Sequence, residues 1–333
     1  MGLGLNFRKR GLMATRLRRC PVVAFSLVLL LSACVPEPPA PPPTPTATAV
    51  LPSPTPISTS TPALPSTQAF PSPEPSPTAT VETVLPEAME VVVTANLAYA
   101  RDVQLDVYRP AGPGEWPVVL LLHGGGLSKT SVSGLARAIS GQGLVVFVPT
   151  YSSNPPSPQA ITLGAEDVAC AARYARTHAA EYGGNAGRLV AVGHSGGGAF
   201  GMLLALAGDE FTGDCVIPDG GGLVDGLVGL DGAYDLMRYI SASTLERAPG
   251  EDWLAISPYA QLERQPFRPG VTFRLFTGRE TELVQDGQAM RDALARAGYP
   301  VEFTQIPGVD HMGMASSKRS QTLQAIVELA RGS

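Results

Sequence analysis

The fold of this 333-residue chain is decided by one stretch, Leu189-Val-Ala-Val-Gly-His-Ser-Gly-Gly-Gly198. Its first four residues are apolar, which suits a central parallel strand that is covered on both faces. A helix-like run, Ala199-Phe-Gly-Met-Leu-Leu-Ala-Leu-Ala207, follows at once. We therefore predict a buried strand, a tight glycine turn with Ser195 at its tip, and a helix.

Ser195 lies within Gly193-His-Ser-Gly-Gly197, which matches the G-x-S-x-G pattern of a nucleophile elbow in the strand, turn and helix context that this pattern requires. A serine in such a strained turn needs neighbours without side chains. Its hydroxyl then protrudes, and the following N–H stays open to a developing oxyanion. The alternative is a glycine-rich turn that merely contains a serine.

A second glycine run follows another apolar strand, because Pro117-Val-Val-Leu-Leu-Leu122 ends in His123-Gly-Gly-Gly126. This run resembles the H-G-G-G oxyanion loop of lipases and esterases. By that resemblance Gly125 and Gly126 supply N–H donors, and the N–H of Gly196 joins them. A phosphate cradle or a plain turn is the alternative, although the Rossmann and P-loop spacings are both absent here.

Strands and helices alternate along the chain after residue 87. We expect strands at 89–94, 103–108, 117–122, 144–148, 189–192, 227–231, 271–277 and 301–306, and helices near 131–140, 164–182, 281–297 and 321–331. The glycine-rich segment 209–225 is irregular, and it forms either a flap beside the site or a surface loop. The alternation predicts an α/β fold with a mostly parallel central sheet and helices on both faces.

A serine hydroxyl needs a general base, and the chain offers four histidines for this role. His123 opens the glycine loop, and His178 is expected on the surface of a helix. The side chain of His194, beside Ser195, must point elsewhere. We therefore assign the base to His311, which follows the last predicted strand, where the serine, acid, histidine order of α/β-hydrolases places it. A solvated loop histidine is the alternative.

The acid that orients the base is expected in the loop after the strand at 271–277. The α/β-hydrolases that this chain resembles in its elbow and glycine loop usually have Gly-x-x-Asp there, whereas this chain has Gly-Arg-Glu-Thr-Glu, with Thr281 at the position expected for aspartate. We prefer Glu280 as the acid, since it precedes the helix within the loop. Glu282 is expected at the start of the helix, where its negative charge interacts favourably with the helix dipole. Asp231, at the end of an earlier strand, is the next candidate, and a dyad without an acid stays open.

With these motifs in place, residues 89–331 resemble an α/β-hydrolase of the carboxylesterase type, similar to small exported esterases and to feruloyl or acetyl-xylan esterases. The resemblance implies a cofactor-free acyl transfer, with Ser195 as nucleophile and His311 as base. Its substrate would be a small-molecule or polysaccharide-linked ester. A peptidase or amidase of the same fold, or a catalytically weak binding protein, are the alternatives. We find no metal-ligand spacing in the sequence.

The leader carries six basic residues and then an apolar run from Pro21 to Leu31, which ends in Leu-Ser-Ala-Cys34. This order is typical of an export signal, and the run is shorter than the roughly 20 residues of a membrane span. Leu-Ser-Ala-Cys resembles the lipobox of bacterial lipoproteins, which implies cleavage before Cys34 and lipid attachment to it. We therefore expect a signal peptide at 1–33 and a protein anchored at the outer face of the cell membrane. An ordinary signal peptide cut near Ala33, or an uncleaved anchor, is the alternative.

Residues 34–86 are expected to form the lipidated cysteine and a spacer. From Pro36 onward this segment is dominated by Pro, Thr, Ser and Ala and holds no glycine, so it cannot build a core. In an extended polyproline-like conformation it would reach on the order of 150 Å. Residues 87–333 remain as one catalytic domain, long enough for a buried core.

The net charge and the cysteine content indicate which partners the protein can bind and in which compartment it folds. The formal net charge is −5. Without the six basic residues of the leader, 18 basic side chains face 29 acidic ones, which gives −11 and makes nucleic acid an improbable partner. Cys20 leaves with the leader and Cys34 is the expected lipid site. Cys170 and Cys215 then predict one disulfide in an oxidising compartment, and two separately buried thiols are the alternative.

Overall fold

The computed structural model describes residues 87–332, except for 154–156, 240–252, 280 and 317–319. The expected signal peptide, Cys34 and the spacer therefore lie outside the described residues, and so does Glu280. All described residues belong to one compact unit. The boundaries expected for the leader and the spacer stay predictions.

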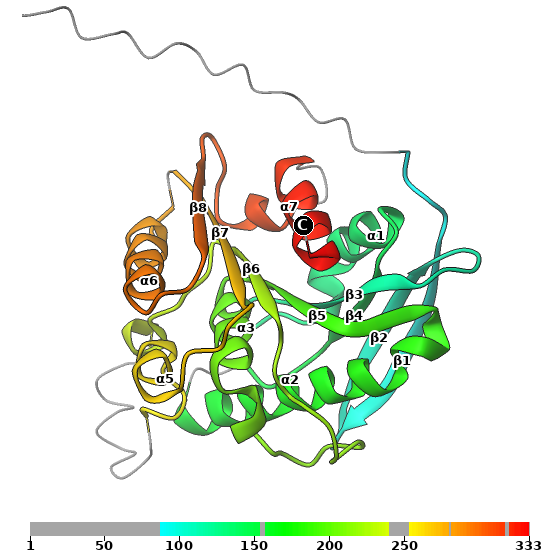
Figure 1. Cartoon of the computed structure of the whole chain (residues 1–333), viewed down its shortest axis with the longest axis horizontal. Helices are drawn as coiled ribbons and strands as arrows, with labels where there is room; N and C mark the ends of the chain where they lie inside the picture. Colours follow the sequence, from blue (N-terminus) through cyan, green and yellow to red (C-terminus); the bar gives the residue numbers. More distant parts are fainter. Residues whose placement is uncertain (1–86, 154–156, 240–252, 280, 317–319, 333) are drawn as a thin grey trace, which may run out of the picture. The chain divides into compact units, whose positions relative to one another are not determined.

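The described residues form one eight-stranded sheet with the order β1-β2-β4-β3-β5-β6-β7-β8 (Figure 1). Its pairs are antiparallel only where β1 joins β2 and β2 joins β4, and the other pairs are parallel. The prediction of a mostly parallel sheet is thus confirmed. The strands are β1 (Val91–Ala100), β2 (Val103–Pro110), β3 (Trp116–Leu122), β4 (Val145–Pro149), β5 (Gly184–His194), β6 (Gly226–Leu230), β7 (Thr272–Gly278) and β8 (Val301–Ile306).

Helices cover both faces of this sheet, as the sequence predicted. Helices α1 and α7 pack on one face, and α2, α3 and α6 pack on the other (Figure 1). None of the helices in the described part of the chain combines the length and the apolar character needed to cross a membrane. The helices are α1 (Ser133–Gly141), α2 (Pro158–His178), α3 (Gly196–Ala207), α5 (Pro258–Arg264), α6 (Val284–Arg296) and α7 (Ser320–Arg331).

Strand β3 shows why the central strands are continuously apolar. Val118, Leu120 and Leu122 pack into the core beneath α2 and α3. Val119 and Leu121 point the other way, into the core beneath α1 and α7. All five side chains are fully buried. Because successive side chains of a strand point to opposite faces, a strand between two helical layers needs apolar residues at every position.

The sequence-based prediction placed the start of one helix too late and missed a second helix, and both helices begin with the same Ser-Pro pair. Helix α2 begins at Pro158, whereas the prediction placed its start near Gly164. Ser157 caps this helix, because its side chain accepts a hydrogen bond from the N–H of Ala160 at 3.1 Å. The short helix α5, which we did not predict, starts with the same Ser-Pro pair at Ser257. A capping serine followed by proline is therefore the signal that both starts share.

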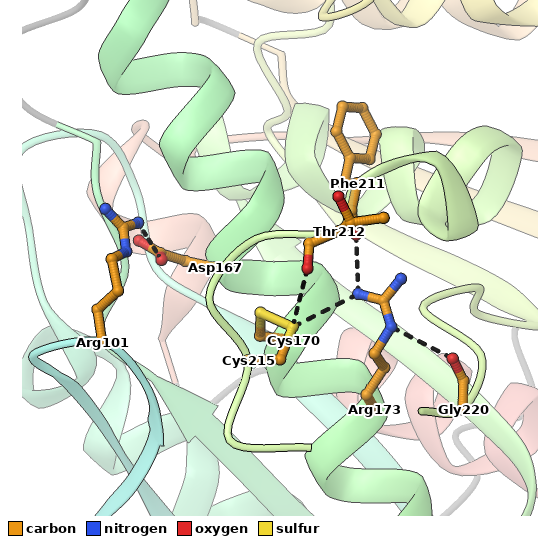
Figure 2. Close-up of a disulfide and its surroundings, with 8 residues drawn as sticks. All are labelled: Arg101, Asp167, Cys170, Arg173, Phe211, Thr212, Cys215 and Gly220. Atoms are coloured by element: carbon orange, nitrogen blue, oxygen red, sulfur yellow. Dashed lines mark hydrogen bonds and ion pairs between the residues drawn. A yellow bond between two sulfur atoms is a disulfide. The ribbon is translucent and has the colours of Figure 1, made fainter. Parts of the chain in front are cut away.

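A disulfide ties the irregular segment after α3 to helix α2 (Figure 2). Cys170 on α2 is bonded to Cys215, 45 residues later, which confirms the predicted pair. One helical turn on from Cys170, the guanidinium of Arg173 donates to the carbonyl oxygens of Phe211 at 2.8 Å and of Gly220 at 3.2 Å. The segment is thus fixed to α2 by one covalent bond and by two hydrogen bonds from a buried arginine.

Helix α2 is also tied to the turn between β1 and β2, about one turn before the disulfide. Asp167 is buried, and its Oδ1 lies 2.5 Å from the guanidinium of Arg101 (Figure 2). Its Oδ2 accepts the N–H of Ser152 at 3.0 Å. Both carboxylate oxygens therefore have partners, as a buried charge requires. The contacts join α2 to the start of the sheet and to the segment that follows β4.

We predict that the double substitution C170A/C215A lowers the free energy of unfolding by about 2–4 kcal/mol, because a cross-link across 45 residues restricts the unfolded chain. Urea unfolding at 25 °C measures this loss. Wild-type protein with a reducing agent serves as the matched comparison and should unfold at the same urea concentration as the variant. Equal stability of oxidised wild type and variant would contradict the prediction.

Candidate active site

The predicted elbow is present at the junction of β5 and α3. Strand β5 ends at His194, α3 begins at Gly196, and Ser195 between them has φ 55° and ψ −124°. A positive φ is unusual for a residue other than glycine and marks stored backbone strain. The turn is held by hydrogen bonds from the N–H of Ser195 to the carbonyl of Leu230 at 3.1 Å, and from the N–H of Gly198 to the carbonyl of Ser195 at 2.9 Å.

Close packing explains the glycines that surround Ser195. A Cβ at Gly193 would lie 2.2 Å from the carbonyl oxygen of Gly197, and a Cβ at Gly197 would lie 2.5 Å from that of His123. Neither position therefore accepts a side chain. A Cβ at Gly196 would lie 3.3 Å from the backbone nitrogen of Gly125. The elbow and the H-G-G-G loop are thus in direct contact, with the amides of Gly125 and Gly196 close together.

His123 holds the H-G-G-G loop in place and is not available as a base. Its ring stacks on Tyr151, with centroids 4.1 Å apart and planes inclined by 12°. The Tyr151 hydroxyl donates to the carbonyl of His123, and the Nδ1 of His123 lies 2.8 Å from the carbonyl oxygen of Gly124. Burial lowers the pKa of His123 to about 4, so its imidazole is neutral near neutral pH.

His311 lies after β8, at the start of a short 3₁₀ turn over Met312–Ala315, and its imidazole contacts a buried carboxylate. Its Nδ1 lies 2.5 Å from Oδ2 of Asp231, which is 0% exposed. A carboxylate at this distance keeps the proton on Nδ1, which leaves Nε2 free to accept one. The hydrogen bond to Asp231 raises the pKa of His311, burial opposes this, and Asp231, Glu282 and Asp310 add a smaller rise through their charges.

Among the described residues, the acid in contact with His311 is Asp231, which the sequence ranked as the next candidate after the two glutamates. The preferred Glu280 lies outside the described residues. Glu282 is exposed and has no hydrogen bond to His311 within the described part of the chain. The expectation followed relatives that carry the acid after β7. Here the acid follows β6, which pairs with β7 in parallel, so both strand ends lie at the same edge of the sheet.

Thr281, at the position where the resemblance led us to expect aspartate, contacts the carboxylate of Asp231. Its hydroxyl lies 2.8 Å from Oδ1 of Asp231 and 3.1 Å from the carbonyl oxygen of Gly278. The N–H of Asp231 donates to the carbonyl of Phe276 at 2.7 Å. Both carboxylate oxygens of Asp231 thus have partners. Its backbone has a φ of 51°, a left-handed conformation that aspartate tolerates better than most residues.

A cavity of about 340 Å³ joins the predicted site residues. Ser195 and His311 line it, and so do Gly125, Gly126 and Gly196. Within the described residues, no hydrogen bond joins Ser195 to His311, and such pairs commonly tighten only when a substrate binds. The cavity is also lined by Ser153, Ile161, Phe200, Ala233, Leu236, Tyr239, Glu282 and Leu283.

Two further expectations concern what surrounds this cavity. None of the residues 209–225 lines it. Among the described residues, no group of three or more His, Cys, Asp or Glu side chains is arranged to hold a metal ion.

Comparisons with known proteins give a partial family match and a shared fold. Residues 105–265 match the family model described as BD-FAE. The search of curated proteins found no match. Similar solved structures include esterase B from Lactobacillus rhamnosis, which is 14% identical with a TM-score of 0.59, where the likeness covers 74% of this chain and 86% of that one.

Two other solved structures agree with this result. A truncated carbohydrate esterase from gut microbiota is 18% identical with a TM-score of 0.57, and the likeness covers 72% of this chain and 95% of that one. The butyrate-bound esterase Est2 from Thermogutta terrifontis is 22% identical with a TM-score of 0.54, with 74% and 93% covered. At such identities the likeness shows the fold, which is that of the α/β-hydrolases, as predicted.

We predict that D231N slows the labelling of Ser195 by a fluorophosphonate probe by about 10³- to 10⁴-fold, because an amide no longer holds the base in its reactive tautomer or stabilises its charged form. The acid limb of the labelling rate should also move to lower pH, since the Asp231 hydrogen bond is what raises the pKa of His311. E282Q and E280Q are the matched controls and should label within about threefold of wild type. A large loss of labelling rate in E280Q, with none in D231N, would instead identify Glu280, in the loop after β7, as the acid.

The contact between Thr281 and Asp231 gives a second prediction. T281V removes the hydroxyl and keeps the shape of the side chain, so labelling of Ser195 should slow by about tenfold, as expected for losing one hydrogen bond to a charged group. T281S keeps the hydroxyl and should label at close to the wild-type rate. Equal rates for the valine and serine variants would show that the hydroxyl has no part in holding Asp231.

Proposed function

We propose that this chain, whose residues 105–265 match the BD-FAE family model and whose fold is that of the α/β-hydrolases, hydrolyses carboxylic esters with Ser195 as the nucleophile. One observation carries the proposal. A single cavity is lined by Ser195, by His311 and by the glycines of the H-G-G-G loop, and His311 in turn contacts the buried Asp231. This arrangement supplies a nucleophile, a base, an orienting acid and oxyanion donors at one place.

The first half of the reaction forms an acyl-enzyme. Nε2 of His311 takes the proton from the Ser195 hydroxyl while the serine oxygen bonds to the ester carbonyl carbon. The carbonyl electron pair moves onto its oxygen, which accepts hydrogen bonds from the N–H groups of Gly125, Gly126 and Gly196. Donors of this kind are worth about 3 kcal/mol each in the transition state. The Asp231 carboxylate stabilises the imidazolium that forms.

The collapse of the first tetrahedral intermediate completes the acyl-enzyme, and its hydrolysis then releases the acid and restores the free enzyme. The tetrahedral intermediate collapses, and the alkoxide leaving group takes the proton from His311 as it departs as the alcohol. A water molecule then gives a proton to His311 and attacks the acyl carbon bound to Ser195. When this second intermediate collapses, the carboxylic acid leaves and the serine oxygen regains its proton. No atom changes its oxidation state over the cycle, so the reaction consumes only water and the ester.

The cavity supports a substrate with a small acyl group. Its volume of about 340 Å³ is at the lower end of the range for small-molecule sites. Five apolar side chains from α2, α3 and the segments after β6 and β7 line it, namely Ile161, Phe200, Ala233, Leu236 and Leu283. We propose small-molecule or polysaccharide-linked esters as substrates, an assignment that the similarity to a gut carbohydrate esterase supports.

We further propose that the enzyme is exported and anchored at the outer face of the membrane through a lipid on Cys34. The basic leader, the short apolar run and the Leu-Ser-Ala-Cys box support this location. The Cys170–Cys215 disulfide fits an oxidising compartment outside the cytoplasm. The Pro-rich spacer of residues 34–86 would let the catalytic domain reach esters at a distance from the membrane.

The alternative of a catalytically weak binding protein is not favoured. It was motivated by the absence of an aspartate at the position of Thr281. Asp231 contacts His311 from the neighbouring strand end, which removes that reason. The peptidase or amidase alternative has no observation in its favour beyond the shared geometry of the site.

Hydrolysis of p-nitrophenyl acetate by the purified full chain tests the proposal. Wild type should turn over the ester, and S195A and H311N should each lose at least about 10⁴-fold in kcat, because the nucleophile or the base is gone. H178N is the matched control for the histidine change, since His178 on α2 pairs with Glu181 outside the cavity. A wild-type protein without turnover, or an S195A variant that keeps the wild-type rate, would refute the proposed function.

A further inference from the structure

His194 is a buried histidine within the elbow that the proposed reaction does not use directly. The sequence indicated only that its side chain points away from Ser195. In the structure the side chain is 1% exposed, and its Nε2 lies 2.9 Å from the backbone carbonyl oxygen of His311. The two imidazole rings lie close together, with centroids 4.7 Å apart and planes inclined by 32°. The residue before the nucleophile thus contacts the residue that serves as the base, 117 positions later.

The direction of this hydrogen bond follows from the acceptor. A carbonyl oxygen only accepts, so Nε2 of His194 must carry the proton and donate it. Burial lowers the pKa of His194, which keeps its imidazole neutral, with the single ring proton on Nε2. A neutral ring is also required here, because a second positive charge beside His311 would oppose the imidazolium that forms during the reaction.

The other side of the His194 ring lies against the oxyanion loop. A Cβ at Gly124 would lie 3.4 Å from Nδ1 of His194 and 3.3 Å from the Cβ of Ser195. His194 therefore sits between the loop that supplies oxyanion donors and the loop that supplies the base. Any movement of its ring would change the spacing of the two loops.

Two contacts then fix His311 through different parts of the residue. Asp231 binds the side chain at Nδ1, and His194 binds the backbone at the carbonyl oxygen. The same carbonyl also accepts the N–H of Met314 at 3.3 Å, but that contact lies within the 3₁₀ turn and moves with it. The hydrogen bond from His194 ties the turn to the elbow, and it therefore helps to set where Nε2 lies relative to Ser195. A displacement of about 1 Å in such a geometry can cost 10²-fold in rate.

We propose that His194 is a positioning residue, which donates its Nε2–H to the carbonyl of His311 and so holds the loop that carries the base against the elbow that carries the nucleophile. This inference rests on the proposed ester hydrolysis. His194 takes no proton from the substrate and acts only through the placement of His311.

The test compares H194Q with H194M in hydrolysis of p-nitrophenyl acetate by the full chain. Gln and Met are both unbranched and similar in length, and only Gln carries an N–H near the position of the histidine Nε2. H194Q should keep kcat within about threefold of wild type. H194M should lose about 10- to 100-fold in kcat with KM within about threefold, because the base is misplaced while the cavity walls remain.

The pH profile separates positioning from space filling. The charged and titratable groups that face His311 are Asp231, His194, Glu282 and Asp310. When the backbone contact is lost, His311 loosens its hydrogen bond to Asp231, so the acid limb of kcat/KM should move to lower pH in H194M. In H194Q the limb should stay at the wild-type position. A purely space-filling residue would move neither limb.

The experiment distinguishes a failure of the role proposed for His194 from a failure of the proposed ester hydrolysis. If the wild type hydrolyses the ester and S195A does not, the function stands. Equal kcat values and equal acid limbs for H194Q and H194M would then overturn only the role of His194. Thermal unfolding identifies a variant that does not fold, and if H194M is such a variant, H194N replaces it. The amide of Asn lies near the position of Nδ1 and falls short of the His311 carbonyl, so the same loss is expected.

Discussion

A carboxylate without solvent exposure, that of Asp231, is the constraint on which the rest of this site depends. A buried charge is costly unless each of its oxygens has a partner. Here one oxygen binds Nδ1 of His311 and the other binds the hydroxyl of Thr281. The two partners come from loops after β8 and β7, so satisfying one charge draws three separate segments together. The same contacts give His311 the tautomer that a general base needs.

The sheet makes this convergence possible. Strands β5, β6, β7 and β8 are successive parallel neighbours, so the segments that follow them all leave at one edge. Ser195 follows β5, Asp231 follows β6 and Thr281 follows β7. An acid after either β6 or β7 is therefore close to a histidine after β8. In this chain Asp231 follows β6 and Thr281 follows β7, so the order of the motifs along the sequence does not by itself give the strand end that holds the acid.

The sequence predicts the parts of this molecule that are local in the chain. The elbow at Ser195, the glycine loop before Gly126 and the apolar runs of the central strands each depend on residues within about ten positions. The identity of the acid depends on contacts between residues 231, 281 and 311, and single-sequence patterns do not give such distances. The role of His194 was missed for the same reason, since its acceptor is 117 residues away. The start of α2 is different, because the Ser-Pro pair at residues 157–158 is a local signal that could have been used.

The central claim, that a buried carboxylate sets the state of the base, is tested most directly by NMR titration of the four histidines in the intact protein. The account predicts that His311 titrates above its ordinary value of 6.5, with the proton of its neutral form on Nδ1. His123, whose pKa burial lowers to about 4, serves as an internal reference in the same spectra. A His311 that titrates at or below 6.5, or whose neutral form carries its proton on Nε2, would contradict the account.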